Sequence, residues 1–261
     1  MSLGALLLIA SPFVGSWLAT LAVRLPEGEP VAWARSRCRS CGHRLAPRDL
    51  VPLLSWLVLR GRCRYCGGAI STYYPLAELV ALALAGAAVA LESGPFVLVT
   101  CCFGWALLAL ALSDLRAFLL PDAIVLPLIP CGLAVAAFAA PEPGVTGAAI
   151  AGEHVVAAAL GYGVFAAVGW AYRAVRKREG LGAGDAKLMA AAGAWLGWQP
   201  LALLVMLAAG MALAGALLAH RTLALGSLRT QKVPFGAPLA AAIFLFWLAR
   251  SWWGLYELRI I

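Results

Sequence analysis

The residues best suited to chemistry in this chain are a few aspartates set among apolar residues. Asp185 lies in the stretch Gly182 to Lys187, directly before the apolar run Leu188 to Trp195. The chain has 12 acidic residues in 261, and 63% of its residues are hydrophobic. A carboxylate beside or inside a membrane is energetically costly and usually has a function. The flanking glycines, Gly182 and Gly184, allow the backbone to bend sharply and a substrate backbone to come close.

Two other aspartates are candidate partners of Asp185. Asp114 falls at the C-terminal end of an apolar segment, where the helix dipole disfavours a negative charge, so a functional role is favoured. Asp122 follows Pro121 and begins the next segment, which is typical of a helix N-cap. Two carboxylates that share a site cannot both ionise cheaply, and together they can act as general acid and general base on water. The residues alone leave non-catalytic alternatives open. Asp114 could be a loop carboxylate paired with Arg116, and Asp185 could be a helix cap.

The elements that position these aspartates are membrane helices. A mean hydropathy of +0.90 with 12% charged residues is typical of a membrane protein. We therefore expect an all-α polytopic membrane protein with about eight transmembrane helices, the first of them retained because its apolar stretch is too long for a signal peptide. The expected segments cover residues 3–23, 75–92, 95–113, 122–140, 153–172, 186–198, 200–219 and 234–253.

The basic residues predict the orientation of the chain in the membrane. Nine arginines lie within residues 24–74, the only long polar region, so this region is expected in the cytoplasm. Alternate threading of the helices places 18 of the 20 basic residues on that side, together with all three aspartates considered above. The net charge of +8 therefore reflects membrane topology, and we expect no nucleic-acid partner.

The sixth apolar segment is too short to cross a bilayer. From Asp185 to the turn at Gly197 it reaches roughly 20 Å at about 1.5 Å per residue, against a hydrocarbon core of about 30 Å. If this helix begins below the membrane surface, Asp185 is recessed. Non-helical backbone at such depth is tolerated where it lines a water-filled cavity.

Four cysteines in the polar region have the spacing of a zinc site. Cys38 and Cys41 form one C-x2-C pair, Cys63 and Cys66 form a second one, and 21 residues lie between the two pairs. Four thiolates make the closed tetrahedral shell of a structural zinc site, and disulfides are disfavoured in the cytoplasm. Unligated thiols or a redox pair are the alternatives. Cys101, Cys102 and Cys131 are expected to be small packing residues of apolar helices, and His43 is not needed as a ligand.

The combination of these motifs resembles the type IV prepilin peptidases, which are bifunctional leader peptidases and N-methyltransferases of pilus and type II secretion systems. The resemblance covers nearly the whole chain. Its motifs are Arg37 to His43, Asp49 to Trp56, Gly61 to Cys66, Tyr74 to Leu79, Asp114 to Pro127, Gly182 to Trp198, and Pro234 to Gly236. One departure is Ala19 in Gly15-Ser16-Trp17-Leu18-Ala19, because the family usually has asparagine there.

The resemblance implies that Asp114 and Asp185 are the catalytic pair, and so it favours Asp114 over Asp122. It implies cleavage of the basic leader from prepilin or pseudopilin precursors, after a glycine, at the cytoplasmic face of a bacterial inner membrane. It further implies methylation of the new N-terminus with S-adenosylmethionine as methyl donor. Gly182, Gly184 and Lys187 are expected to support the site, and Pro234, Phe235 and Gly236 to help align the substrate.

These expectations define three parts and two rival functions. Residues 1–23 form the first transmembrane helix, residues 24–74 a cytoplasmic zinc-knuckle domain, and residues 75–261 a transmembrane aspartyl peptidase domain. The main alternative is a transporter that uses the aspartates as an ion or proton relay. It predicts polar residues deep in several helices, whereas these segments are almost entirely Ala, Leu and Val. A zinc-bearing membrane scaffold without catalysis is a third possibility.

Overall fold

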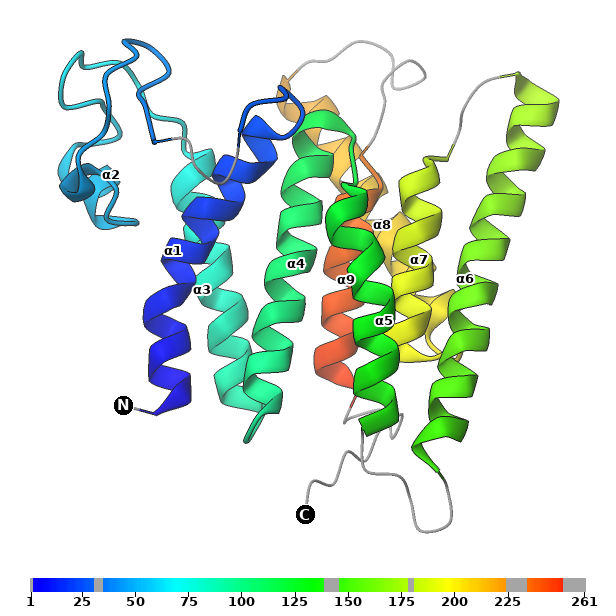
Figure 1. Ribbon diagram of the computed structural model, residues 1–261. Helices are drawn as coiled ribbons and strands as arrows, with labels where there is room; N and C mark the ends of the chain where they lie inside the picture. Colours follow the sequence, from blue (N-terminus) through cyan, green and yellow to red (C-terminus); the bar gives the residue numbers. More distant parts are fainter. Residues whose placement is uncertain (1, 31–34, 139–145, 178–180, 224–233, 251–261) are drawn as a thin grey trace. The chain divides into compact units, whose positions relative to one another are not determined.

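The computed structural model describes residues 2–30, 35–138, 146–177, 181–223 and 234–250 (Figure 1). Within these residues the chain is helical, with two isolated β-bridges and no sheet. The elements are α1 (Leu3–Arg24), η1 (Pro47–Asp49), α2 (Leu54–Val58), α3 (Tyr73–Leu91), α4 (Phe96–Ala117), α5 (Asp122–Phe138), α6 (Gly147–Arg176), α7 (Ala183–Leu196), α8 (Leu201–Leu223) and α9 (Gly236–Ala249).

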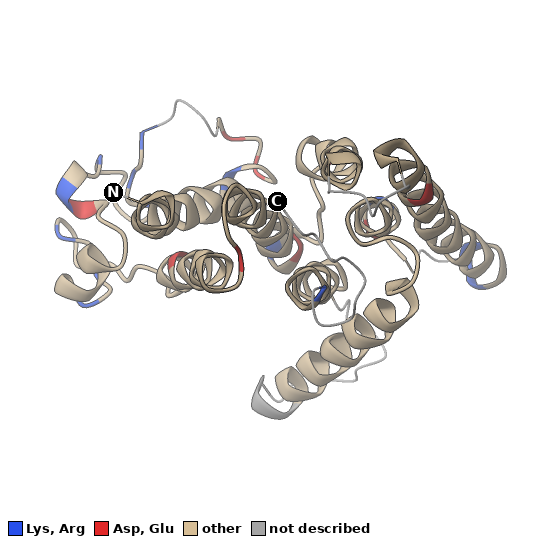
Figure 2. Cartoon of the chain, turned by 90° about the horizontal axis from the view of Figure 1, so that it is seen from below, with Lys and Arg blue, Asp and Glu red and all other residues tan. Residues whose placement is uncertain are grey.

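Each of the eight expected apolar segments coincides with a helix, which confirms the prediction of an all-α polytopic membrane protein. The last residues of two segments, 139–140 and 251–253, lie outside the described residues, as do Arg178, Arg229, Lys232 and Arg259. Five helices are long and apolar enough to cross a membrane: α1, α3, α4, α6 and α8. Because α5, α7 and α9 are shorter, the number of eight spans stays a prediction. Figure 2 shows few charged residues along the helical ribbons.

The chain divides into two compact units, Met1–Leu112 and Ser113–Ile261. In the first unit α1 and α3 lie side by side (Figure 1). Their backbones come close at Gly15, because a Cβ added there would lie 2.7 Å from the carbonyl oxygen of Ala77 and from Cα of Glu78. Small residues allow membrane helices to pack in this way, since dispersion forces rather than water exclusion hold them together.

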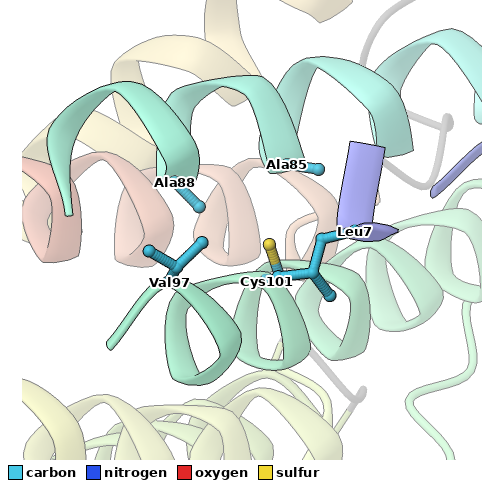
Figure 3. Packing of buried hydrophobic residues seen from close by; sticks show 5 residues of the cluster. All are labelled: Leu7, Ala85, Ala88, Val97 and Cys101. Atoms are coloured by element: carbon cyan, nitrogen blue, oxygen red, sulfur yellow. The ribbon is translucent and has the colours of Figure 1, made fainter. Parts of the chain in front are cut away.

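A small apolar core joins three helices of this first unit (Figure 3). Leu7 of α1, Ala85 and Ala88 of α3, and Val97 and Cys101 of α4 form it. Cys101 is fully buried, as predicted for a small packing residue. The prediction is wrong for Cys102 and Cys131, which lie on exposed faces of α4 and α5. The exposed helix faces of this protein are apolar, as expected for surfaces that contact the acyl chains of a bilayer.

In the second unit α7 is the central helix. It packs against α5, α6 and α9, and 11 of its 14 residues are buried. Trp195 donates a hydrogen bond from Nε1 to the carbonyl oxygen of Leu128 in α5, at 2.8 Å. His154 of α6 lies 2.9 Å through Nδ1 from the carbonyl oxygen of Ala194. The short helix that carries Asp185 is therefore fixed to its neighbours at its C-terminal end.

Candidate active site and cysteine cluster

Asp114 lies in the last turn of α4, and its carboxylate binds the N-terminus of α9. Its side chain is buried, with the residue 5% exposed. Oδ2 accepts a hydrogen bond of 2.8 Å from the backbone N–H of Ala237, and the N–H of Gly236 also donates to this carboxylate. The first N–H groups of a helix have no partner within the helix, and the helix dipole is positive there. A buried negative charge is therefore stabilised at this position.

Asp185 occupies the first turn of α7 and binds the start of its own helix. It is 8% exposed, and Oδ2 accepts a hydrogen bond of 3.2 Å from the N–H of Gly182, the residue that precedes the helix. Asp185 is therefore buried within the protein, and its depth below the membrane surface stays a prediction. Each aspartate thus lies at the positive end of a helix dipole, one at α7 and the other at α9.

The structure brings Asp114 and Asp185 close enough for their carboxyl groups to interact electrostatically. The helices that bind them, α7 and α9, pack against each other. Two carboxyl groups that interact in this way do not both ionise readily. This arrangement can provide a general acid and a general base for one water molecule.

The glycines of the site make room for side chains of the chain itself. A Cβ on Gly182 would lie 3.2 Å from Oδ2 of Asp185. A Cβ on Gly184 would lie 2.9 Å from Cβ of Leu120, and one on Gly236 would lie 3.0 Å from Cγ of Asp114. The sequence predicted that the small size of Gly182 and Gly184 makes room for a substrate backbone. Leu120 was not predicted as part of the site, because an apolar residue beside a proline has no distinctive sequence signal.

Lys187 and Asp122 form an ion pair at the beginnings of α7 and α5. Nζ of Lys187 lies 2.7 Å and 2.8 Å from the two carboxylate oxygens of Asp122. The positive charge of Lys187 is therefore directed to Asp122. Asp122 is the first residue of α5 and not its N-cap, because the carbonyl oxygen of Pro121 accepts the first N–H bonds of the helix.

The stretch Pro234 to Gly236 leads directly into α9. The ring of Phe235 lies 6.3 Å from that of Phe165 in α6, measured between centroids. The contribution of this stretch to the site is the N–H of Gly236, which binds Asp114 together with the N–H of the next residue, Ala237. The predicted role in substrate alignment stays a prediction.

The four predicted cysteine ligands converge in the first unit. The sulfur atoms of Cys38, Cys41, Cys63 and Cys66 all lie within 4.8 Å of one another. The Sγ atoms of Cys38 and Cys66 are 3.9 Å apart. A tetrahedral zinc site with Zn–S bonds of about 2.3 Å has sulfur atoms about 3.8 Å apart. The donor set and its geometry fit a zinc ion, so the cluster can bind zinc as predicted.

The two cysteine pairs, called here the first knuckle (Cys38 and Cys41) and the second knuckle (Cys63 and Cys66), have the same local geometry. The N–H of Gly42 donates to the carbonyl oxygen of Cys38 at 2.8 Å, and that of Gly67 donates to Cys63 at 2.9 Å. Both glycines have positive φ, 71° and 70°, which other residues rarely adopt. His43 stacks on Tyr65 across the two knuckles, with ring centroids 3.7 Å apart, and is not one of the four ligands.

Asp49 ties the second knuckle to the segment that follows the first. Its side chain, 3% exposed, lies 2.7 Å from Nε of Arg64 and also accepts from the hydroxyl of Tyr65 and the N–H of Ala46. The hydrogen bond from Arg64 holds the pKa of Asp49 below its usual value. A lowered pKa means that this stabilisation is present at neutral pH and is lost only as the pH falls through the lowered value.

Replacement of Asp49 by alanine is expected to loosen the cysteine module. The loss of a buried carboxylate with three donors costs about 1–2 kcal/mol, discounted for the partial exposure of Arg64. Zinc transfer to a colorimetric chelator should accelerate by a factor of about 5–30, and the ratio to wild type should stay constant between about pH 6 and 8. Arg48→Gln, which changes an exposed neighbour, is the control. Equal release from Asp49→Ala and wild type would contradict the assigned role.

Glu78 ties the chain after the first knuckle to the membrane helices of its unit. It is 5% exposed, its Oε2 accepts a hydrogen bond of 2.7 Å from the N–H of Leu53, and Ser16 of α1 bonds to its side chain. Leu53 has a φ of 61° and is the centre of a tight turn, since the N–H of Leu54 lies 2.6 Å from the carbonyl oxygen of Pro52. Such a turn is strained and persists only where its surroundings hold it.

Glu78→Ala is expected to release this turn. Without the carboxylate the N–H of Leu53 has lost its acceptor, which costs about 1–2 kcal/mol. Local opening of the turn at Leu53 should therefore increase by a factor of about 5–30. Limited trypsin digestion at Arg60 and Arg62 measures this opening. Glu78→Gln, which keeps an acceptor oxygen, should lie closer to wild type. If the alanine and glutamine variants are cleaved at the wild-type rate, Glu78 does not hold the turn.

The described residues thus define a class: a multi-pass helical membrane protein with a buried aspartate pair at two helix N-termini and a four-cysteine cluster. Comparison with known proteins places the chain within that class. Residues 9–92 match the bacterial peptidase A24 N-terminal domain, and residues 101–220 match the type IV leader peptidase family.

Three relatives illustrate the match, each named prepilin leader peptidase/N-methyltransferase. The protein of Aeromonas salmonicida is 40% identical over 84% of this chain and 71% of its own length. That of Dickeya chrysanthemi is 41% identical over 84% and 76%, and that of Pseudomonas putida is 38% identical over 92% and 87%. No solved structure gives a significant match. The chain belongs to the type IV leader peptidase family, which confirms the family that its motifs indicate, and it is an enzyme of the protease class.

Proposed function

We propose that this protein cleaves the basic leader from prepilin-like precursors at the cytoplasmic face of a bacterial inner membrane. The observation that supports this best is the buried pair Asp114 and Asp185, held at two helix N-termini in a chain of the leader peptidase family. The choice of precursors follows from the relatives, which are named prepilin leader peptidase/N-methyltransferase. The family match favours the peptidase over the transporter considered above, whose test would be ion flux in proteoliposomes without proteolysis.

We assign the general base to Asp114 and the general acid to Asp185. Asp114 accepts from two backbone N–H groups, which stabilise its charged form, whereas Asp185 accepts from Gly182 and lies beside the charge of Asp114. Asp114 takes a proton from water as the water oxygen attacks the scissile carbonyl carbon, and Asp185 protonates the carbonyl oxygen. The tetrahedral intermediate, a gem-diol, then breaks its C–N bond: the leaving amine takes the proton held by Asp114, and Asp185 recovers a proton from one hydroxyl of the gem-diol as the carbonyl re-forms.

The second half of the proposal is methylation of the new N-terminus. The names of the relatives support it, and S-adenosylmethionine is the donor that the family resemblance implies. No described residue is assigned to the donor. Ala19, at the position where the family usually has asparagine, is fully buried in α1. The cofactor that the chain's own residues fit is a structural zinc ion on Cys38, Cys41, Cys63 and Cys66.

The test is to mix the purified protein with a prepilin-like precursor and to analyse the product by mass spectrometry. Loss of the leader supports the peptidase, and a methyl increment after addition of S-adenosylmethionine supports the transferase. An intact precursor under conditions where zinc is bound would contradict the peptidase. The expected division at residues 23 and 74, with a separate zinc module, remains part of this proposal.

A further inference from the structure

The link between α4 and α5 places one apolar side chain inside the site. The chain leaves α4 at Ala117, and Phe118 has a φ of 53°, with its N–H donating to the carbonyl oxygen of Asp114 at 2.9 Å. After this left-handed turn Leu119 is 43% exposed, whereas Leu120 is 8% exposed. The turn therefore directs Leu119 outward and Leu120 inward, six residues after Asp114.

Leu120 contacts the N-termini of both helices that bind the aspartates. Its Cβ, Cδ1 and Cγ lie 2.9, 3.1 and 3.4 Å from the place of a Cβ on Gly184, the neighbour of Asp185. Its Cδ1 and Cδ2 both lie 3.0 Å from the place of a Cβ on Gly236, the neighbour of Ala237. A single side chain thus fills the space between the start of α7 and the start of α9.

This contact bears on the distance between the two carboxyl groups. Asp185 moves with the start of α7, and Asp114 is bonded to the start of α9. Packed interiors resist compression, so a side chain between two elements sets how closely they approach. An apolar group beside the pair also keeps the local dielectric constant low, which strengthens the interaction between the carboxyl groups.

We propose that Leu120 is a positioning residue, a spacer that sets the separation of Asp114 and Asp185. The expected effect of Leu120 on precursor cleavage rests on the proposed function. Its effect on the interaction between the two carboxyl groups can be measured without any turnover. Leu120→Ala removes the atoms that contact Gly236 and part of those that contact Gly184. The two helix starts then lose a common support, and the carboxyl groups are no longer held at one distance.

The kinetic test compares Leu120→Ala, Leu120→Met and Leu119→Ala on a prepilin-like precursor. A displacement of about 1 Å can cost about 10²-fold in rate, so kcat of Leu120→Ala should fall by about 10- to 100-fold, with KM changed less than about threefold. Water that enters the space left by Leu120 raises the local dielectric constant and weakens the coupling of the two carboxyl groups. The bell-shaped pH–rate profile should therefore narrow, because the two apparent pKa values of the pair come closer together. Leu120→Met, which conserves volume, should restore most of kcat, and Leu119→Ala should match wild type.

A titration separates this proposal from the proposed function. The chain has only four aspartates, Asp49, Asp114, Asp122 and Asp185, so carboxyl carbons labelled in aspartate can be followed individually by NMR in micelles. Leu120→Ala should reduce the separation of the two titration steps of Asp114 and Asp185. The other charged side chains of α4, α5, α7 and the last turn of α6 are unchanged by the substitution: Arg116, Asp122, Lys187, Arg173 and Arg176.

The outcomes are distinct. A smaller separation between the two titration steps in Leu120→Ala supports the role of Leu120 as a spacer, even if no precursor is cleaved. In that case only the proposed function has failed. Titration steps that keep their wild-type separation in folded Leu120→Ala overturn the spacer, whatever kcat does. A fall in kcat that only follows the fraction of folded protein, with an unchanged pH profile, also overturns it.

Discussion

Asp114→Asn and Asp185→Asn, made separately, are each expected to lower precursor cleavage by about 10²- to 10⁴-fold. An amide cannot exchange a proton with water at neutral pH, so either substitution removes one half of the acid–base pair. The backbone donors at Gly182, Gly236 and Ala237 can still bond to an amide oxygen, so both variants should fold. The rate of leader loss, followed by mass spectrometry, is the measurement.

Asp122→Asn is the matched control for this experiment. It changes a carboxylate at the start of α5 whose side chain is 55% exposed and paired with Lys187. Exposed pairs of this kind contribute about 0.2–1 kcal/mol, so activity should stay within a factor of about five of wild type. Wild-type cleavage by either Asp114→Asn or Asp185→Asn would show that the pair is not the catalytic group. A collapse of activity in Asp122→Asn of the same size would remove the reason to prefer Asp114.

Cys38→Ser and Cys63→Ser are expected to lose zinc and folded yield together. A serine hydroxyl does not replace a thiolate as a zinc ligand, and a structural zinc site supplies folding free energy directly, about 10–16 kcal/mol in isolated zinc-finger peptides. Elemental analysis should find about one zinc ion per chain in the wild type and a small fraction of that in each variant. Zinc chelation of the wild-type protein should have the same effect on yield and on protease resistance.

Cys131→Ser is the matched control, since Cys131 is exposed on α5 and is not one of the four clustered cysteines. It should keep both the zinc content and the yield of the wild type. Equal zinc in Cys38→Ser, Cys63→Ser and the control would exclude the four-cysteine site. Lower yield with full zinc content would assign these cysteines to packing instead.

The helices and the two kinds of site could be predicted because each has a local signature. Long apolar runs in a bilayer can only be helices, since every backbone group must be bonded internally. The cysteine pairs and the stretch Gly182 to Lys187 carry their spacing in a few consecutive residues. The position of Asp114 at a helix C-terminus favoured it over Asp122, but a loop carboxylate paired with Arg116 remained possible, so the choice between the two needed the family resemblance.

The contacts that build the site could not be predicted in this way. The hydrogen bond from the N–H of Ala237 to Asp114 joins residues 123 positions apart in the sequence. The hydrogen bond from the N–H of Leu53 to Glu78 joins residues 25 positions apart. Leu120 contacts two glycines from separate helices. Such contacts depend on how several helices pack together, and no single stretch of sequence contains that information. The pairing of Lys187 with Asp122 rather than with Asp114 or Asp185 is of the same kind.

The burial of α7 also bears on how the enzyme responds to its lipid. Bilayers of different thickness act on helices that face the acyl chains, through tilt and local thinning. In this unit such faces belong to helices like α6 and α8, whose outward residues include Leu160, Val164 and Leu213. Helix α7 has almost no outward face, because α5, α6 and α9 cover it. Hydrophobic mismatch is therefore absorbed by the surrounding helices, and turnover should be nearly constant across vesicles of different acyl-chain length.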